Sequence, residues 1–270
     1  MFIDTHAHLL DGKFDKDRTE VIARALEQKV LKIVEIGCDK NDCEKTIEFA
    51  EKNENIYFTL GIHPQNSAET LPDDFLKLKD LAKHPKCIGI GETGLDYHYE
   101  SSQKPAQKGA FVEHLKIARE LAKPIILHCR DAYKDFVDIL ENDLKENGPV
   151  KGVVHCFSGS KAYALKLIQL GFFLGIDGPV TYPGSNDLRE TVSAVPIENI
   201  LLETDCPYLA PQERRGQRNE PAFLPFIANQ IAKIKKIDIE AVEQMTTKNA
   251  VKLFGFNGEF TPGVKKTHRV

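Results

Sequence analysis

Histidine and carboxylate residues stand where short apolar segments of this sequence end. His6 and His8 close the first such segment, and Glu203 and Asp205 close the last one. Side chains two residues apart in an extended strand point to the same side, so each pair can present two polar groups at one place. Four more apolar segments end with one such residue each: His63, Glu92, His128 and His155. Because imidazole and carboxylate groups are typical ligands of divalent metals, the pattern indicates a metal centre.

The apolar segments alternate with segments of helical periodicity along the whole chain. We predict strands over 2–8, 32–38, 57–63, 87–92, 124–128, 152–155, 172–176 and 200–205. We predict helices over 18–29, 41–52, 74–83, 106–122, 133–145, 162–170, 188–194 and 221–235. Alternation of this kind is typical of parallel strands joined by right-handed crossovers.

The number of these units favours a closed barrel. Eight strand and helix units fit a (β/α)8 TIM barrel, an α/β fold that commonly takes about 250 residues, and this chain has 270. A doubly wound sheet is the alternative, but Gly89 and Gly91 lie inside a predicted strand, and no Gly-x-Gly-x-x-Gly opens the first helix. We therefore predict one barrel domain over 1–256, with a last helix over 239–253 packed on its outside. Residues 257–270 are predicted to form a C-terminal tail.

A barrel would bring the polar residues together, because the C-terminal ends of its strands form the catalytic face. Four imidazoles and two carboxylates at this mouth are enough for two divalent cations with one bridging carboxylate. These six candidate ligands are His6, His8, His128, His155, Glu92 and Asp205. Burying so many ionisable groups without an ion would carry a large desolvation cost. The set leaves Mg²⁺, Mn²⁺ and Zn²⁺ open, although Mg²⁺ prefers oxygen ligands.

The other histidines and all six cysteines are interpreted as structural. A hydrogen-bonding role is the commoner one for histidines in loop, helix or tail positions: His84, His98, His114 and His268. Cys129, Cys156 and Cys206 directly follow candidate ligands, and strand alternation turns them toward the helices, where cysteine behaves as a small hydrophobe. Cys38 and Cys43 flank a strand-to-helix turn, and the sequence places no histidine base near them.

Arginines are the candidate contacts to an anionic substrate. Arg130 lies two residues after His128, so it shares the inward side and can bind a phosphate or pair with a carboxylate. The loop after the last predicted strand carries Arg214, Arg215 and Arg218. Loops after the last two strands bind phosphate in many TIM barrels. The alternative for this loop is a solvated run of charge.

Composition excludes some classes of protein. The sum of 36 basic and 40 acidic residues gives a net charge of −4, which excludes an overall basic protein that coats nucleic acid. An acidic enzyme still handles nucleic acid if a metal and a few arginines meet the phosphates. No apolar run is long enough to span a membrane. The cysteines form no C-x-x-C pair and no signal peptide is evident, so we expect reduced thiols, a cytoplasmic location and no obligate protein partner.

Seven short motifs resemble, in order, those of the TatD-type metal-dependent deoxyribonucleases. The resemblance extends over about 1–256, and the full set in order is far more specific than any one motif. In one-letter code the motifs are DTHAH at 4–8, GIHP at 61–64, GETGLDY at 91–97, HCR at 128–130, HCFSG at 155–159, ETDCPYLAP at 203–211 and RGQRNEP at 215–221.

The resemblance implies an amidohydrolase-like TIM barrel and a metal-dependent phosphodiesterase on DNA, commonly a 3′–5′ exonuclease. It implies two divalent metal cations (Mg, Mn or Zn) and a DNA substrate that is single-stranded or has a 3′ end. One cation would be bound by His6, His8 and Asp205, the other by His128 and His155, with Glu92 bridging. Glu203 would be a supporting carboxylate in the catalytic set with Glu92 and Asp205. The implied substrate contacts are His63, Arg130, Arg215 and Arg218.

Other functions are compatible with the same ligands. Metal amidohydrolases also combine His-x-His with distant histidine and aspartate, so amide hydrolysis or ester cleavage on aminoacyl-tRNA is the enzymatic alternative. Glu92 stands where several such relatives use a modified lysine, which favours the nuclease by resemblance. The non-enzymatic alternative is a metal-holding or DNA-repair scaffold, which the complete ligand set disfavours.

Overall fold

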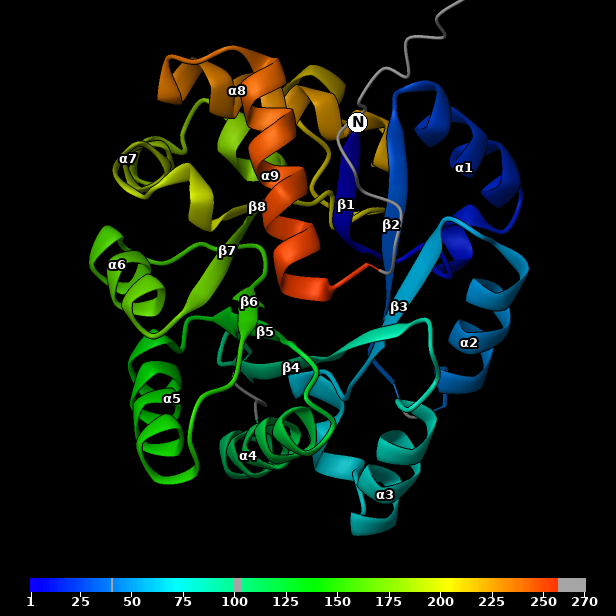
Figure 1. The fold of residues 1–270 in the computed structure, drawn as a ribbon, viewed down its shortest axis with the longest axis vertical. Helices are drawn as coiled ribbons and strands as arrows, with labels where there is room; N and C mark the ends of the chain where they lie inside the picture. The colour runs from blue at the N-terminus through cyan, green and yellow to red at the C-terminus, as the bar shows by residue number, and fades with distance from the viewer. Residues whose placement is uncertain (40, 100–102, 257–270) are drawn as a thin grey trace, which may run out of the picture.

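The computed structural model of the protein describes residues 1–39, 41–99 and 103–256. Within this part, eight parallel strands form one sheet in chain order, and helices surround it (Figure 1). The strands are β1 (Phe2–Ala7), β2 (Val30–Gly37), β3 (Ile56–Leu60), β4 (Cys87–Asp96), β5 (Ile125–Arg130), β6 (Gly152–Val154), β7 (Phe172–Ile176) and β8 (Ile200–Leu202). A parallel bridge between Ala7 and Cys206 joins the first strand to the segment after the last. The sheet therefore closes, and the predicted TIM barrel is confirmed.

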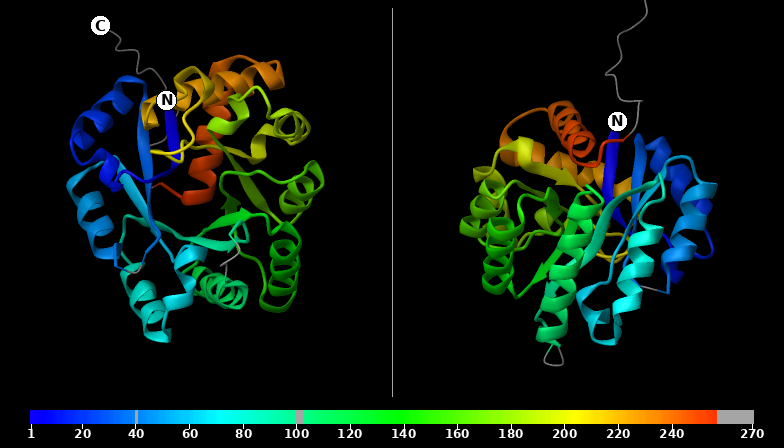
Figure 2. Two further views of the ribbon diagram at one scale, coloured as in Figure 1. Left: turned by 180° about the vertical axis from the view of Figure 1, so that it is seen from behind. Right: turned by 60° about the horizontal axis from the view of Figure 1, so that its bottom comes forward.

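A helix follows each strand and covers the outside of the barrel, as both views in Figure 2 show. The helices are α1 (Arg18–Glu27), α2 (Cys43–Lys52), α3 (Pro72–Leu81), α4 (Lys104–Glu120), α5 (Tyr133–Asn147), α6 (Lys161–Gln169), α7 (Asn186–Ala194), α8 (Leu224–Lys235) and α9 (Ile239–Phe254). Two strands end earlier than the sequence predicts: β3 ends at Leu60 and β8 ends at Leu202. The predicted tail, 257–270, lies outside the described residues.

The last helix corrects the sequence prediction, because α9 closes one end of the barrel rather than packing on its outside. Leu253 and Phe254 of α9 form a buried cluster with residues of the barrel interior. The interior members from the strands are Ile3, Val34, Ile36, Ile88, Ile126, Val153, Phe173 and Leu201. Figure 1 shows α9 crossing in front of the strands. The other end of the barrel is thereby left as the accessible mouth.

Two more observations bear on the sequence predictions. In the part of the chain that the structure describes, no helix has the length and apolar character needed to cross a membrane. All six cysteines are free, and four of them are buried: Cys43, Cys87, Cys129 and Cys206.

The seam between the first and last strands depends on a buried carboxylate. Asp4 accepts a hydrogen bond from the Thr204 backbone N–H at 2.9 Å and another from the Thr204 hydroxyl at 2.6 Å. Both residues are buried. A carboxylate in this setting is costly unless it is hydrogen-bonded, so these two bonds hold the barrel closed beside the mouth.

We expect Thr204→Val to lower the free energy of unfolding by about 1–3 kcal/mol, because it leaves an Asp4 oxygen unpaired. Urea unfolding measures this change. Thr59→Val is the matched control, since the Thr59 hydroxyl is buried without a hydrogen-bond partner among the described residues. Equal stability of both variants would mean that the Asp4 contact does not hold the seam.

Candidate metal centre

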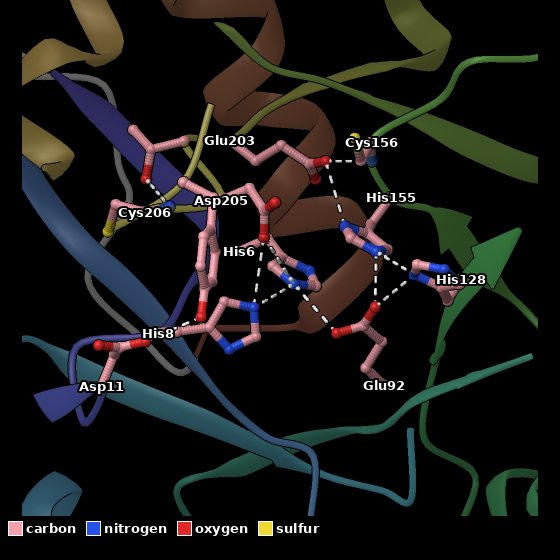
Figure 3. Close-up of polar contacts among 12 residues, drawn as sticks. His6, His8, Asp11, Glu92, His128, His155, Cys156, Glu203, Asp205 and Cys206 are labelled. Atoms are coloured by element: carbon pink, nitrogen blue, oxygen red, sulfur yellow. Dashed lines mark hydrogen bonds and ion pairs between the residues drawn. The ribbon is translucent and has the colours of Figure 1, made fainter. Parts of the chain in front are cut away.

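The candidate ligands meet at the mouth because the strands end beside one another. His128 lies in β5, two residues after the interior residue Ile126. His155 follows the end of β6 and lies two residues after the interior residue Val153. Strand alternation alone therefore turns both imidazoles inward. Figure 3 shows these side chains converging with others from the opposite side of the barrel.

On that opposite side, His6, His8 and Asp205 form one group whose ligand atoms lie within 4.8 Å of one another. The two Nε2 atoms of His6 and His8 are 3.2 Å apart. Asp205 Oδ1 lies 3.3 Å from His8 Nε2 and 3.6 Å from His6 Nε2. Asp205 lies beyond the end of β8 and has a positive φ of 55°. Its backbone N–H donates to the His6 carbonyl, which fixes it beside β1.

Glu92, His128 and His155 form the other half of the centre. Glu92 Oε1 lies 2.8 Å from His128 Nδ1 and 2.7 Å from His155 Nε2. These two nitrogens are 3.1 Å apart. Glu92 and His155 are buried, whereas the side chain of His128 is 16% exposed and faces the mouth.

The two halves meet at the Glu92 carboxylate. While Oε1 faces His128 and His155, Oε2 lies 3.4 Å from His6 Nε2 (Figure 3). The rings of His6 and His155 are stacked, with centroids 3.9 Å apart. One carboxylate thus directs its two oxygens to two different groups of imidazoles.

The spacing of the nitrogens suits shared metal ions. Two nitrogens bound at about 2.0–2.1 Å to one four-coordinate ion lie roughly 3.1–3.4 Å apart. The His6–His8 and His128–His155 pairs have this spacing. Nδ1 of His6 is also buried without a hydrogen-bond partner among the described residues. The donor set and its spacing therefore fit divalent cations.

Comparisons with known proteins agree with this geometry. A family model described as "TatD related DNase" matches residues 3–255. An uncharacterized metal-dependent hydrolase, YabD of Bacillus subtilis (strain 168), is 40% identical over 257 residues, which is 95% of this chain and 100% of that protein. This chain belongs to the TatD family of metal-dependent hydrolases. The family resemblance of the sequence motifs is thereby confirmed.

Two further TatD-family proteins are similar over nearly the whole chain. The 3′-5′ ssDNA/RNA exonuclease TatD of Cronobacter sakazakii (strain ATCC BAA-894) is 35% identical, covering 93% of this chain and 97% of that protein. The crystal structure of YjjV, a TatD homolog from Escherichia coli K12, superimposes with a TM-score of 0.88 at 28% identity and covers 94% of this chain and 98% of that one. This chain and YjjV therefore share one barrel fold.

His63 joins this candidate metal centre from the loop after β3. Its Nε2 lies 3.7 Å from Glu92 Oε1, and it groups with Glu92 and His128. Burial lowers the pKa of His63 to about 4, so the ring is neutral at pH 7. Nδ1 accepts a hydrogen bond from the Gln65 backbone N–H. The ring proton is thus on Nε2, which can donate to a ligand at the mouth.

Glu203 lies behind the centre rather than in it. It is fully buried, accepts a hydrogen bond from the Cys156 backbone N–H, and has Oε1 3.8 Å from His155 Nδ1. Burial raises the pKa of Glu203 well above its ordinary value, and the neighbouring Asp177 adds to this rise. Glu203 therefore lies beside His155 without a hydrogen bond to it, since His155 Nδ1 is buried without a hydrogen-bond partner among the described residues.

Asp96 is a site residue that the sequence interpretation did not assign, although it lies in the GETGLDY motif. Its Oδ2 is 3.4 Å from His128 Nε2 and accepts a hydrogen bond from Gln65 Nε2. A carboxylate on the far nitrogen of a metal-binding imidazole fixes the ring and raises its basicity. Asp96 is therefore placed to orient His128.

The three candidate arginines differ in what their guanidinium groups contact. Arg130 ends β5 and is exposed, with its guanidinium carbon 6.0 Å from the centroid of the Tyr99 ring. Arg215 lies 4.3 Å from the centroid of the Tyr182 ring. Arg218 instead forms a bidentate pair with Asp17, with both N···O distances 2.7 Å. The Asp17 carboxylate occupies the fork that a phosphate would need, which removes Arg218 from the substrate contacts we propose below.

The surroundings of one cysteine, Cys38, differ from those that the sequence indicates. Cys38 was interpreted as structural because the sequence shows no histidine near it, but the fold places its side chain beside the His8 imidazole. The contact depends on the β1–β2 register, in which Ala7 pairs with Glu35. No local sequence signal carries this information.

The imidazoles of the metal-free centre differ in charge. Burial alone would lower the pKa of His128, but the carboxylates of Asp96 and Glu92 outweigh it and raise the pKa to about 9. Burial likewise opposes protonation of His8, yet the contact with Asp205 raises its pKa well above the ordinary value. With no metal bound, the His128 ring is therefore protonated at pH 7, and the contact with Asp205 favours the protonated form of His8.

We expect metal binding to release protons, because a histidine must be deprotonated before it binds a metal. Affinity should fall as pH falls below the raised pKa of His128, by about tenfold per pH unit for each proton displaced. Calorimetric titration with Zn²⁺ at pH 6 and pH 8, both below that pKa, should give an affinity at least about 100-fold weaker at pH 6. The same affinity at both pH values would show that these rings are not ligands.

Proposed function

We propose that this TatD-family hydrolase is a 3′–5′ exonuclease that cleaves phosphodiester bonds of single-stranded DNA with two divalent cations. The observation that carries the proposal is the Glu92 carboxylate, whose oxygens face His6 on one side and His128 with His155 on the other. A named 3′-5′ ssDNA/RNA exonuclease at 35% identity supports the substrate class. RNA is the second substrate to test for the same reason.

In this proposal His6, His8 and Asp205 would hold one cation, His128 and His155 would hold the other, and Glu92 would contribute one oxygen to each side. When bound there, such cations lower the pKa of a water toward about 7 and neutralise charge on a phosphoryl group. The chain's own residues must supply the remaining tasks: a proton acceptor, contacts to phosphate oxygens, and fixed orientation of the ligands.

Asp205 is the proposed proton acceptor. Burial would raise its pKa, but the contacts with His8 and His6 outweigh burial and lower it below the ordinary value. The carboxylate is therefore unprotonated at neutral pH and can take the proton of an attacking water. Its side chain is 13% exposed, so it reaches the mouth while held by β1.

Substrate contacts are proposed for His63, Arg130 and Arg215. The neutral His63 ring donates from Nε2, beside Glu92. Arg130 follows His128 by two residues in β5, and its exposed guanidinium can bind a phosphate with two parallel hydrogen bonds. Arg215 is carried by the loop after β8, at the opposite side of the mouth from β5.

We expect Arg130→Ala to lower kcat/KM for single-stranded DNA about 10- to 100-fold, mainly by raising KM. This range corresponds to the loss of a hydrogen-bonded contact between charged groups, about 1.5–3 kcal/mol. Steady-state rates on a fluorescent oligonucleotide measure the change. Lys116→Ala is the control, because this exposed lysine lies on α4 and pairs with Glu113. If both substitutions lower kcat/KM equally, the decrease comes from the loss of positive charge in general and not from a contact of Arg130 with the substrate.

The proposed activity is tested by digesting 5′-labelled single-stranded DNA with the metal-loaded protein. A ladder that shortens stepwise, and that disappears when a chelator removes the metal, is the expected result. DNA labelled at the 3′ end should lose its label at once, because the first cleavage releases the labelled nucleotide. If DNA and RNA both stay intact with two ions bound per chain, the substrate is instead an amide or an ester.

A further inference from the structure

A second group of acidic and thiol side chains lies next to the proposed metal pair. One ligand atom from each of Cys156, Asp177 and Asp205 lies within 4.8 Å of the others. They follow the ends of β6, β7 and β8, which are adjacent in the sheet. Asp205 also belongs to the group with His6 and His8. The two groups therefore share one carboxylate.

Cys156 reaches this group because its backbone departs from strand geometry. The sequence pattern predicts that its thiol faces the helices, as it would if the strand continued past His155. However, β6 ends at Val154, and Cys156 has a positive φ of 44°. The thiol instead has Asp177 as its hydrogen-bond partner, and the residue is only partly buried.

The side chain of Asp177 indicates that this group binds a ligand. The residue is 1% exposed, and its Oδ2 has no hydrogen-bond partner among the described residues. Behind it, Oε2 of the fully buried Glu203 has none either. Two buried and unpaired carboxylate oxygens in one place are costly, and either a proton or a cation must offset that cost.

The surroundings increase the demand for positive charge. Two carboxylates and one thiol have ligand atoms within 4.8 Å of one another in this group. A divalent cation among them would offset the repulsion between the two carboxylates.

We propose that Cys156, Asp177 and Asp205 bind a third divalent cation beside the metal pair, with Asp205 shared between the two sites. The inference rests on the proposed pair, because Asp205 is placed by its contacts with His6 and His8. One thiolate and two carboxylates favour Zn²⁺, a borderline-soft cation, over Mg²⁺, which binds oxygen ligands. The third cation would add positive charge on the β7 side of the mouth, and by engaging the Asp205 carboxylate it would compete with the proton-acceptor role proposed above for Asp205.

Cobalt titration of the metal-free chain tests this site, because bonding of a thiolate to Co²⁺ gives a charge-transfer absorption in the near ultraviolet. The expected result is about three Co²⁺ ions per chain, with the thiolate absorption present. Cys156→Ser should remove the absorption and leave about two ions bound. Asp177→Asn, which keeps the shape of the side chain, should have the same effect on the ion count. Circular dichroism of each metal-free variant verifies folding.

Cys38→Ser is the matched control, because Cys38 is the other partly buried cysteine at the mouth and lies beside His8. It should keep the absorption and all bound ions. Loss of the absorption in Cys38→Ser rather than in Cys156→Ser would overturn the proposal and move the thiolate ligand to the His8 side. About two ions in the wild type without thiolate absorption would overturn the third site but leave the proposed pair. Fewer than two ions would overturn the pair, and the third site with it.

Discussion

Glu92→Gln is expected to reduce DNA hydrolysis at least about 10³-fold, on the scale of losing a group that stabilises charge in the transition state. The amide keeps the shape of the side chain but presents only one good acceptor oxygen. It therefore cannot hold an ion on the His6 side and another on the side of His128 and His155. Initial rates on 5′-labelled DNA, together with ions counted per chain by mass spectrometry, measure both effects.

The control for Glu92→Gln is another buried carboxylate far from the mouth. Asp143 on α5 pairs with Arg119 and is buried. Asp143→Asn should lower stability, because it breaks a partly buried ion pair, while the rate and the ion count stay at wild-type values. A Glu92→Gln variant that lost an ion but hydrolysed DNA at the normal rate would show that Glu92 does not bridge two catalytic ions.

The alternation of side chains along a strand predicts the direction of only some of the candidate metal ligands. The sequence alone predicts the inward direction of His128 and His155, since each lies two residues after an interior apolar residue of its predicted strand. For β1 the rule fails, because a register shift between Asp4 and Ala7 interrupts the alternation. Ile3 lies in the barrel interior, and Asp4 turns to Thr204.

The contacts that the sequence could not provide are those between distant backbones. The amphipathic pattern of α9 does not distinguish a helix packed on the outside of the barrel from one that closes its end. Both positions bury one face of the helix. The role of Asp96 beside His128 depends on the β4–β5 register, in which Gly94 pairs with His128. Cys156 leaves the alternation through a positive φ that no glycine signals. Each of these differences comes from tertiary packing that overrides a local pattern.

Asp205→Asn is expected to lower the rate about 10²- to 10⁴-fold, the usual contribution of a positioned proton acceptor. Asparagine tolerates a positive φ as aspartate does, so the backbone conformation at 55° should be kept. Asp131 has the same φ of 55° after β5 and pairs with His98 at the surface. Asp131→Asn is therefore a control for the substitution itself, and its rate should match that of the wild type.

Rates at increasing metal concentration separate the two roles of Asp205. An asparagine oxygen can still contact a cation, but the amide cannot accept the proton of an attacking water. If Asp205 is the proton acceptor, saturating metal restores the ion count of Asp205→Asn without restoring the rate. Recovery of the rate with the ions would mean that Asp205 acts only as a ligand. The proton acceptor would then have to be a different group at the mouth, and the neutral imidazole of His63, beside Glu92, would be the next to test.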